Sequence, residues 1–275
     1  MDFNASKCHV LSITKKKSPI LYPYTLNGVQ LSNVKNHPYL GIELDHRLSW
    51  KTHINQTTAK AQRTLNLLRR NLHGCSQKTK ECAYKTMVRP TLEYASAAWD
   101  PYDQKQIKQL EAVQNRAARF VKNEHRREGV SVTGLKESLK WQSLQERRFI
   151  SRQTLFYKAR HGLAAIDIPP YVGRPIPSED NRTRRTSHDY QYRLGHTRVD
   201  AYKYSYFPRT ILAWNILGEH IVTTLNQKGQ PCAELFKTRL TREFTTGRMY
   251  MVDPKGLDRP RLGGTRCARS VGPVY

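Results

Sequence analysis

Apolar residues recur at three- and four-residue steps through the middle of the chain, which is the spacing of an amphipathic helix. The first stripe of this kind contains Trp50, Ile54, Ala61, Leu65, Leu68 and Leu72. Ser49 comes just before it and can cap the helix, because a serine oxygen accepts a free backbone N–H of the first turn. We therefore predict that Leu65 and Leu68 are buried, whereas Arg63 and Arg70, on the far face, are exposed to solvent.

Four more segments of the chain show helical spacing. One begins after Ser76 and runs to Pro90, where the missing N–H predicts a kink or a break. The next begins at Asp103 and has the apolar stripe Ile107, Leu110, Val113, Ala117 and Phe120. A short helix is expected over 132–139, and a fifth helix over 143–162 with a capping box at its start. Amphipathic helices joined by short links indicate a bundle.

Short alternating runs precede the first helix and predict strands. We expect a strand over 7–14, a hairpin that joins 22–26 to 29–32, and a further strand over 38–44. Asn27-Gly28 stands between the two arms of the hairpin, in the setting of a type I′ turn, whose central residues both need a positive φ. The N-terminal part is therefore predicted to be a small antiparallel sheet.

The chain changes character after the bundle. Prolines cluster within 164–190 and the apolar period is lost there, which favours a linker or an extended wrapping segment. Aromatic residues crowd 190–214, where we expect a second small hairpin; they can stack on bases or sugars, or pack in a second core. Two helices carry Trp214 and Phe236, and the final residues, 246–275, are expected to be disordered because they have little to bury.

These patterns predict an α+β fold that is mainly α. We divide it into a small sheet over 1–47, a helical bundle over 48–163, a linker over 164–189, a small C-terminal α/β extension over 190–245 and a disordered tail over 246–275. The bundle is the largest part and has the strongest periodicity.

The positive charge of the chain indicates that the bundle binds polyanions. The 275 residues include 47 Lys and Arg against 22 Asp and Glu, which gives a formal net charge of +25. The excess is spread along the chain, so a basic tail attached to a neutral domain is excluded. Distributed cations suit an extended row of phosphates, and a generally solvated basic surface is the alternative.

Other features of the sequence indicate the cellular compartment of the protein. The chain has no run of 18 uncharged apolar residues, which excludes a membrane-spanning helix and a membrane partner. Its N-terminus lacks the basic-then-apolar pattern of a signal peptide. Five cysteines without a CxxC spacing favour a reducing compartment, so we expect an intracellular protein of the nucleus or cytoplasm.

Catalytic motifs are missing from the sequence. Phosphate-binding glycine loops and a GxSxG motif are absent, and Cys75 and Cys82 have no histidine pair to complete a zinc set. The acids of the N-terminal segment, Asp2, Glu43 and Asp45, are too scattered for a two-metal site. His53 and His73 are interpreted as residues of the polar helix face. We therefore assign no catalytic residue and no metal ligand.

Several motifs in order resemble a known family. The runs PYLGIELDHRLSWKTHI, AKAQRTLNLLRRNL, YKTMVRPTLEYASAAW and LEAVQNRAARFV resemble the C-terminal part of reverse transcriptases from non-LTR (LINE-type) retrotransposons. FNASKCHVL is similar to the segment that follows the catalytic loop of the palm in that family. FPRTILAWNIL and ELFKTRL are similar to the end of the same reading frames. The resemblance extends over about 2–245.

The resemblance implies a role for several parts of the chain. Tyr39, Leu40 and Gly41 would belong to the primer grip, a hairpin at the border of palm and thumb, and the helices that follow would form the thumb, which holds the template–primer duplex. The family enzyme is an RNA-directed DNA polymerase that uses Mg²⁺. Its fingers and its palm loop with paired aspartates would lie upstream of Met1, and the sequence has no counterpart of them or of the endonuclease domain of the full element. We therefore expect a truncated fragment without a cofactor of its own and without polymerase activity alone.

The helices supply the remaining candidates for nucleic-acid binding, which are Lys60, Arg63, Arg69, Arg70, Lys78 and Lys80. The expected partner is RNA, DNA or a hybrid, together with fingers and palm if these are encoded separately. Two alternatives stay open: an independent basic RNA- or DNA-binding protein derived from a retroelement, and a protein-interaction scaffold whose charge is incidental.

Overall fold

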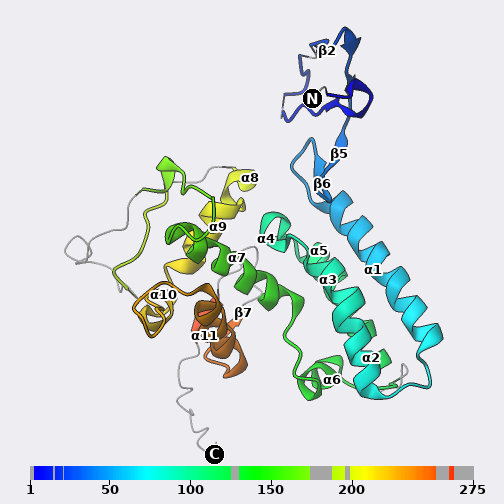
Figure 1. Cartoon of the computed structure of the whole chain (residues 1–275), viewed down its shortest axis with the longest axis vertical. Coiled ribbons are helices and arrows are strands. Elements are labelled where there is room, and N and C mark those ends of the chain that lie inside the picture. Colours follow the sequence, from blue (N-terminus) through cyan, green and yellow to red (C-terminus); the bar gives the residue numbers. More distant parts are fainter. Residues whose placement is uncertain are drawn as a thin grey trace, which may run out of the picture. The chain divides into compact units, whose positions relative to one another are not determined.

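The structure is a computed structural model that describes residues 3–14, 16–20, 22–124, 130–173, 188–195, 199–251 and 260–262. Over these residues the chain is mainly helical, as the sequence pattern predicted, and its strands pair in small two-stranded sheets (Figure 1). The chain divides into two compact units, Met1–Leu144 and Gln145–Tyr275. We describe each unit by itself.

The first unit is built around two long helices, α1 and α5, which pack side by side (Figure 1). Its helices are α1 (Lys51–Asn71), α2 (Gln77–Ala83), α3 (Arg89–Glu93), α4 (Ser96–Trp99), α5 (Gln104–Val121) and α6 (Val132–Ser138). The core between them includes Ile54, Ala61, Leu65, Leu68, Leu110, Val113 and Ala117. Leu65 and Leu68 are buried, whereas Arg63 and Arg70 are exposed, so the predicted faces of α1 are confirmed.

The segment that contains Pro90 stays helical, and the predicted break comes later. Between α2 and α3 lies a single π-helical stretch, η2 (Tyr84–Val88), which continues both helices without a gap. Proline lacks an N–H and its ring crowds the carbonyl four residues earlier, and the wider turn of a π-helix relieves that contact. The chain breaks only at Ala95, whose φ is 50°.

The N-terminal strands form three small sheets and not the single antiparallel sheet that was predicted. Their elements are η1 (Ala5–Lys7), β1 (His9–Val10), β2 (Thr25–Leu26), β3 (Val29–Gln30), β4 (Ser32–Asn33), β5 (Asn36–Tyr39) and β6 (Ile42–Asp45). β1 pairs with β4 in parallel, and β2 pairs with β3 around the predicted Asn27-Gly28 turn. No residue is buried in the described part of 3–50, so these short strands have no apolar core to join them.

The predicted strand over 38–44 is wrong, because this segment is the turn of a hairpin. β5 and β6 pair antiparallel, with Tyr39 opposite Ile42. Leu40 and Gly41 have φ of 47° and 80°, a combination that glycine accepts and that a strand does not contain. The tip rests on Tyr94, whose hydroxyl donates to the Leu40 carbonyl at 3.1 Å.

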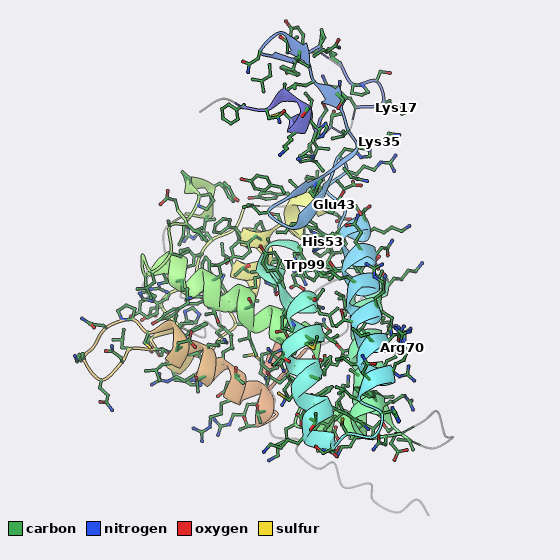
Figure 2. The ribbon with its side chains drawn as sticks, turned by 45° about the vertical axis from the view of Figure 1, so that its right-hand side comes forward. Lys17, Lys35, Glu43, His53, Arg70 and Trp99 are labelled. Atoms are coloured by element: carbon green, nitrogen blue, oxygen red, sulfur yellow. The ribbon has the colours of Figure 1, made fainter. Side chains whose placement is uncertain are left out.

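His53 joins this hairpin to α1 (Figure 2). We had predicted that it lies on the polar face of the helix, and this prediction is wrong. Its side chain is 5 % exposed and its ring meets that of Trp99 at 4.9 Å. Nδ1 accepts the backbone N–H of Glu43 at 3.2 Å, so the ring proton lies on Nε2, which faces the Thr57 hydroxyl. Burial lowers the pKa of His53, because it disfavours the charged ring.

The second unit has its own aromatic core. Its elements are α7 (Leu144–Arg160), η3 (Pro170–Val172), α8 (Asp200–Lys203), α9 (Tyr206–Trp214), α10 (Glu219–Val222), α11 (Ala233–Thr245), β7 (Met249–Met251) and β8 (Pro260–Leu262). Phe156 and Tyr157 of α7 share this core with Trp214 and Phe236. The boundary between the units lies just after Leu144, the first residue of α7, so nearly all of this helix belongs to the second unit, whereas we had placed it in the bundle.

The aromatic-rich stretch of the second unit does not form the hairpin that was predicted, because its later part folds into α8 and α9. Tyr192 and Trp214 are buried in the core, whereas Tyr190 and Tyr202 are exposed, so packing accounts for some of these rings and not for all of them. Val172 of the predicted linker is buried as well, and 174–187 lie outside the described residues. In the predicted tail, β7 and β8 pair antiparallel, and the rest of 252–275 lies outside the described residues.

The faces of α1 make a direct prediction for stability. Leu65→Ala is expected to lower the free energy of unfolding by about 2–5 kcal/mol, because it empties a packed site. Arg63→Ala should change it by less than about 0.5 kcal/mol, as exposed substitutions usually do. Urea unfolding followed by circular dichroism measures both values, and the reverse order would mean that the helix packs through its other face.

The burial of His53 predicts a dependence of stability on pH. The ring of His53 stays neutral to a lower pH in the folded unit than in the unfolded chain. Its contribution to the free energy of unfolding is therefore fully present above the ordinary histidine pKa of about 6.5 and decreases as the pH falls below that value. His161 and His188 also have pKa values lowered by burial, so the test compares wild type with His53→Gln. The difference in unfolding free energy should shrink between pH 7.5 and 5.5; a constant difference would contradict this.

Candidate nucleic-acid interface

The first unit contains a cleft of about 1580 Å³ between α1 and α5. Its lining is Arg63, Asn66, Arg69, Arg70, His73, Lys80, Ala112, Asn115, Arg116, Arg119, Phe120, Asn123, Glu124 and Val132. We call this hollow the basic cleft, because five arginines and one lysine line it against a single carboxylate, that of Glu124. A hollow of this composition attracts anions.

Helical spacing explains how the two walls of the basic cleft arise. On α1, Arg63, Asn66 and Arg70 are three and four residues apart, so they share one face next to the buried stripe. On α5, Asn115 and Arg116 lie four and three residues before Arg119, so each of them shares a helix face with it. When the apolar stripes of α1 and α5 pack together, the arginine-bearing faces beside them therefore line the same cleft.

Side-chain amides connect the two walls. The Arg116 guanidinium donates to Gln62 Oε1, and Gln62 Nε2 donates to Asn66 Oδ1 at 2.8 Å. Further along the same seam, Gln109 Nε2 donates to Asn55 Oδ1 at 2.9 Å. These neutral partners orient Arg116 without cancelling its charge.

The arginines of α1 are available to a ligand. Within the described residues, the side chains of Arg63, Arg69 and Arg70 are exposed and make no ion pair or hydrogen bond to protein. Figure 2 shows Arg70 on α1, far along the helix from His53. The α1 wall therefore presents guanidinium groups that no carboxylate neutralises.

Part of this charge has a structural explanation. Arg69 and Arg70 lie in the last turn of α1, and Arg119 lies in the last turn of α5. Cations there interact favourably with the helix dipole, typically by about 0.3–1 kcal/mol each. Arg63 and Arg116 lie further inside their helices, where the dipole explains nothing, so the helix ends alone do not account for the cleft.

Lys80 is buried, although the sequence placed it on the surface. Its side chain is 1 % exposed, and Nζ donates to the His73 carbonyl at 2.8 Å and to Asn123 Oδ1. The ammonium lies 5.4 Å from the centre of the Phe120 ring. Lys80 thus forms the floor of the basic cleft and does not extend into solvent like a typical phosphate-binding lysine.

The remaining predicted residues lie outside the lining of the cleft. Lys60 and Lys78 are exposed on α1 and α2. Tyr39 and Leu40 are exposed at the tip of the β5–β6 hairpin, with Gly41 beside them, and this hairpin contacts α1 through β6. The structure therefore gathers four of the predicted cations, and it leaves the other residues elsewhere on the same unit.

Sequence reasoning missed the whole α5 wall. Arg116 and Arg119 are part of the run QNRAARF, in which they lie next to the apolar stripe of Val113 and Ala117. Their three-residue spacing was visible. What could not be read from it was that this face of α5 lies beside the arginine face of α1.

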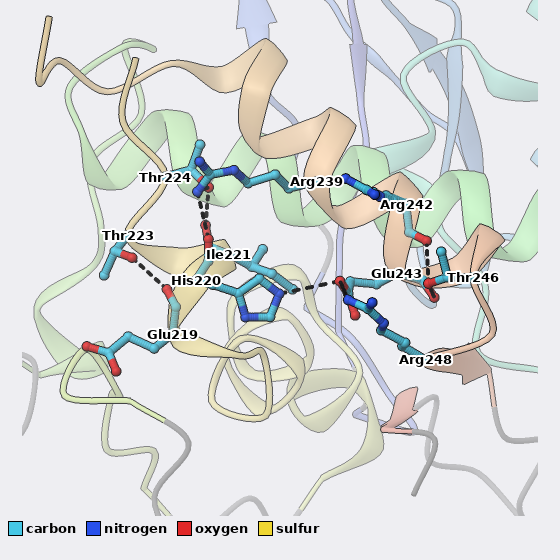
Figure 3. Close-up of polar contacts among 10 residues, drawn as sticks. All are labelled: Glu219, His220, Ile221, Thr223, Thr224, Arg239, Arg242, Glu243, Thr246 and Arg248. Atoms are coloured by element: carbon cyan, nitrogen blue, oxygen red, sulfur yellow. Dashed lines mark hydrogen bonds and ion pairs between the residues drawn. The ribbon is translucent and has the colours of Figure 1, made fainter. Parts of the chain in front are cut away.

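Cations of the second unit are used differently. Glu243 of α11 is 6 % exposed, and its carboxylate lies 3.4 Å from His220 Nε2 and 3.7 Å from Arg248 Nη1 (Figure 3). Arg239 donates to the His220 carbonyl at 2.8 Å, and the Arg160 guanidinium lies 4.4 Å from the Tyr190 ring centre. These contacts tie α10 to α11 and α7 to its neighbours, so the cations act within the fold.

In the part of the chain that the structure describes, no three side chains of His, Cys, Asp or Glu come together as metal ligands would. None of the described helices combines the length and the apolar character that a membrane crossing requires.

Comparison with known proteins gives one informative match. No family model matches the chain, and no solved structure matches it. Over 110 residues the chain is 32 % identical to the probable RNA-directed DNA polymerase from transposon BS of Drosophila melanogaster. The chain is similar to part of a transposon reverse transcriptase. The matched stretch is 39 % of this chain and 12 % of that protein. The match confirms the resemblance that the sequence motifs indicated.

Proposed function

We propose that this chain is a segment of a retroelement reverse transcriptase and that its first unit holds template–primer nucleic acid in the basic cleft. The observation that carries the proposal is the set of unpaired arginines on α1, Arg63, Arg69 and Arg70, which face Arg116 and Arg119 on α5. The relative supplies the nature of the polyanion, since its name describes a polymerase that reads RNA and makes DNA.

The chemistry of the cleft suits the nucleic-acid backbone. Guanidinium groups bind phosphate oxygens through two parallel hydrogen bonds and stay charged at every physiological pH. Phosphate contacts fix the position of a nucleic acid but carry no sequence information. We therefore expect binding that depends strongly on salt and weakly on sequence, to RNA, DNA or a hybrid.

The other candidates of the first unit fit along the same track. α1 has 21 residues and is therefore about 30 Å long, the length of about nine base pairs. The β5–β6 hairpin lies at its start and the basic cleft at its end. In this proposal the hairpin tip, Tyr39 to Gly41, acts as a primer grip, α1–α6 act as a thumb, and Lys60 and Lys78 contact nucleic acid that extends beyond the cleft.

The two alternatives differ in what they explain. An independent RNA- or DNA-binding protein would use the same cleft, and the similarity to a polymerase favours the first interpretation over it. A protein-interaction scaffold needs no cluster of unpaired arginines and does not explain the cleft.

Salt dependence tests the proposed function. Each phosphate contact contributes about 0.9 to the slope of log affinity against log salt on duplex DNA. Arg63→Ala, Arg70→Ala and Arg116→Ala should each reduce the slope by up to about one unit, equally on unrelated sequences. Lys108→Ala is the control, because Lys108 is exposed on α5 outside the lining.

Fluorescence anisotropy with a labelled RNA–DNA duplex, from about 50 to 300 mM salt, measures these slopes. Binding that is insensitive to salt, or that is reduced as much by Lys108→Ala as by the arginine variants, would contradict the proposed function of the cleft.

We also propose that this chain alone does not polymerise. A two-metal site needs carboxylates that converge on Mg²⁺. Glu43 and Asp45 both belong to β6, where Asp45 Oδ1 already accepts the backbone N–H of Arg47 at 2.7 Å, and Asp2 lies outside the described residues. These residues do not fit a Mg²⁺ site, so the metal of the family enzyme would bind elsewhere in the whole protein.

Primer extension on an RNA template with Mg²⁺ or Mn²⁺ tests this prediction, and we expect no incorporation by the purified chain. Template-dependent extension that is lost on replacing Asp2, Glu43 or Asp45 would overturn it.

A further inference from the structure

Lys80 is an unusual residue, because its ammonium is buried without a carboxylate among its described partners. Its side chain is 1 % exposed, and its hydrogen bonds go to a backbone carbonyl and a neutral amide, with an aromatic ring nearby. Burying a cation is unfavourable unless its surroundings compensate the charge. The partners that Lys80 has among the described residues offer only dipoles and an aromatic ring, and none of them is a carboxylate.

The partners of Lys80 belong to the two ends that form the cleft. His73 lies just beyond Leu72, the residue that caps the C-terminal end of α1, and its backbone carbonyl accepts a hydrogen bond from Lys80. Asn123 follows the last turn of α5 and has a φ of 56°. Asparagine is common at this left-handed position, and here its side-chain oxygen accepts from Lys80.

One ammonium thus links α2 to the ends of both helices that provide the walls. Arg70 and Arg119 lie three and four residues before these two anchor points, so their positions depend on where the ends are held. Resting on the proposed function, we propose that Lys80 is the positioning residue of the basic cleft. It holds the α1 and α5 arginines at the spacing that lets them bind one phosphate backbone together.

This role differs from that of a direct phosphate contact in a measurable way. Removing one contact lowers the salt slope by about 0.9. Removing a residue that positions several arginines lowers it by more, because those contacts are lost together. Lys80→Met should therefore reduce the slope by about two units.

The decisive measurement is a double-mutant cycle on the full chain, using the same labelled RNA–DNA duplex. Arg70→Met should weaken binding strongly in the wild-type background and much less in the Lys80→Met background, since the contact is then already lost. Lys108→Met is the matched control, because it removes an exposed lysine of α5 outside the cleft. It should be additive with Arg70→Met.

A variant that leaves the charge of the protein unchanged provides a second test. Asn123→Gly keeps the left-handed backbone, which glycine also accepts, and removes the oxygen that receives Lys80. It should lower the salt slope although no charge has changed. A variant that only lost stability would keep the slope, because its folded fraction would retain every contact; thermal unfolding measures that loss separately.

The outcomes separate the two proposals. If wild-type binding does not depend on salt or on Arg63, Arg70 and Arg116, the proposed function fails. If those arginines behave as expected but Lys80→Met lowers the slope by one unit or less and is additive with Arg70→Met, Lys80 is an ordinary contact and this inference is overturned. If Lys80→Met does not fold, Asn123→Gly decides, and an unchanged slope in that variant overturns the inference.

Discussion

The packing of α1 against α5 is the interaction on which the rest of the first unit depends. Small residues such as Ala61 and Ala117 are fully buried in the shared core, which lets the two helices approach closely. Everything of functional interest lies at the edges of that contact. The basic cleft is the edge where the polar faces of both helices meet, and the β5–β6 hairpin is held at the start of α1 by His53 and by Tyr94 of the segment that follows α3.

The two units divide their positive charge between two physical uses. In the second unit, Arg239 and Arg248 contact a carbonyl and the buried Glu243, and Arg160 stacks on aromatic rings, so charge is used inside the fold. In the first unit, the α1 arginines have no such partners among the described residues. A net charge of +25 is therefore a poor guide by itself, because only cations without internal partners remain available to a polyanion.

The features that the sequence predicted correctly depend on local signals. The helices, the buried faces of α1 and α5 and the Asn27-Gly28 turn all follow from spacing within a few residues. The predictions were wrong at Leu40-Gly41, where an apolar run contains a turn, and at His53, where a polar residue occupies a buried position. In both cases a partner distant in sequence decides the outcome, Tyr94 for the hairpin tip and Glu43 for the histidine.

The candidate site shows the same division more sharply. From the sequence alone, one could determine that Arg63 and Arg70 share an exposed face of α1, because helical periodicity fixes which residues lie side by side on one helix. Only the tertiary structure decided that Arg116 and Arg119 complete the cleft and that Lys80 lies buried beneath it. The physical reason is that periodicity orients side chains around one axis, whereas a cleft and its floor depend on which helices pack together and on where their ends meet.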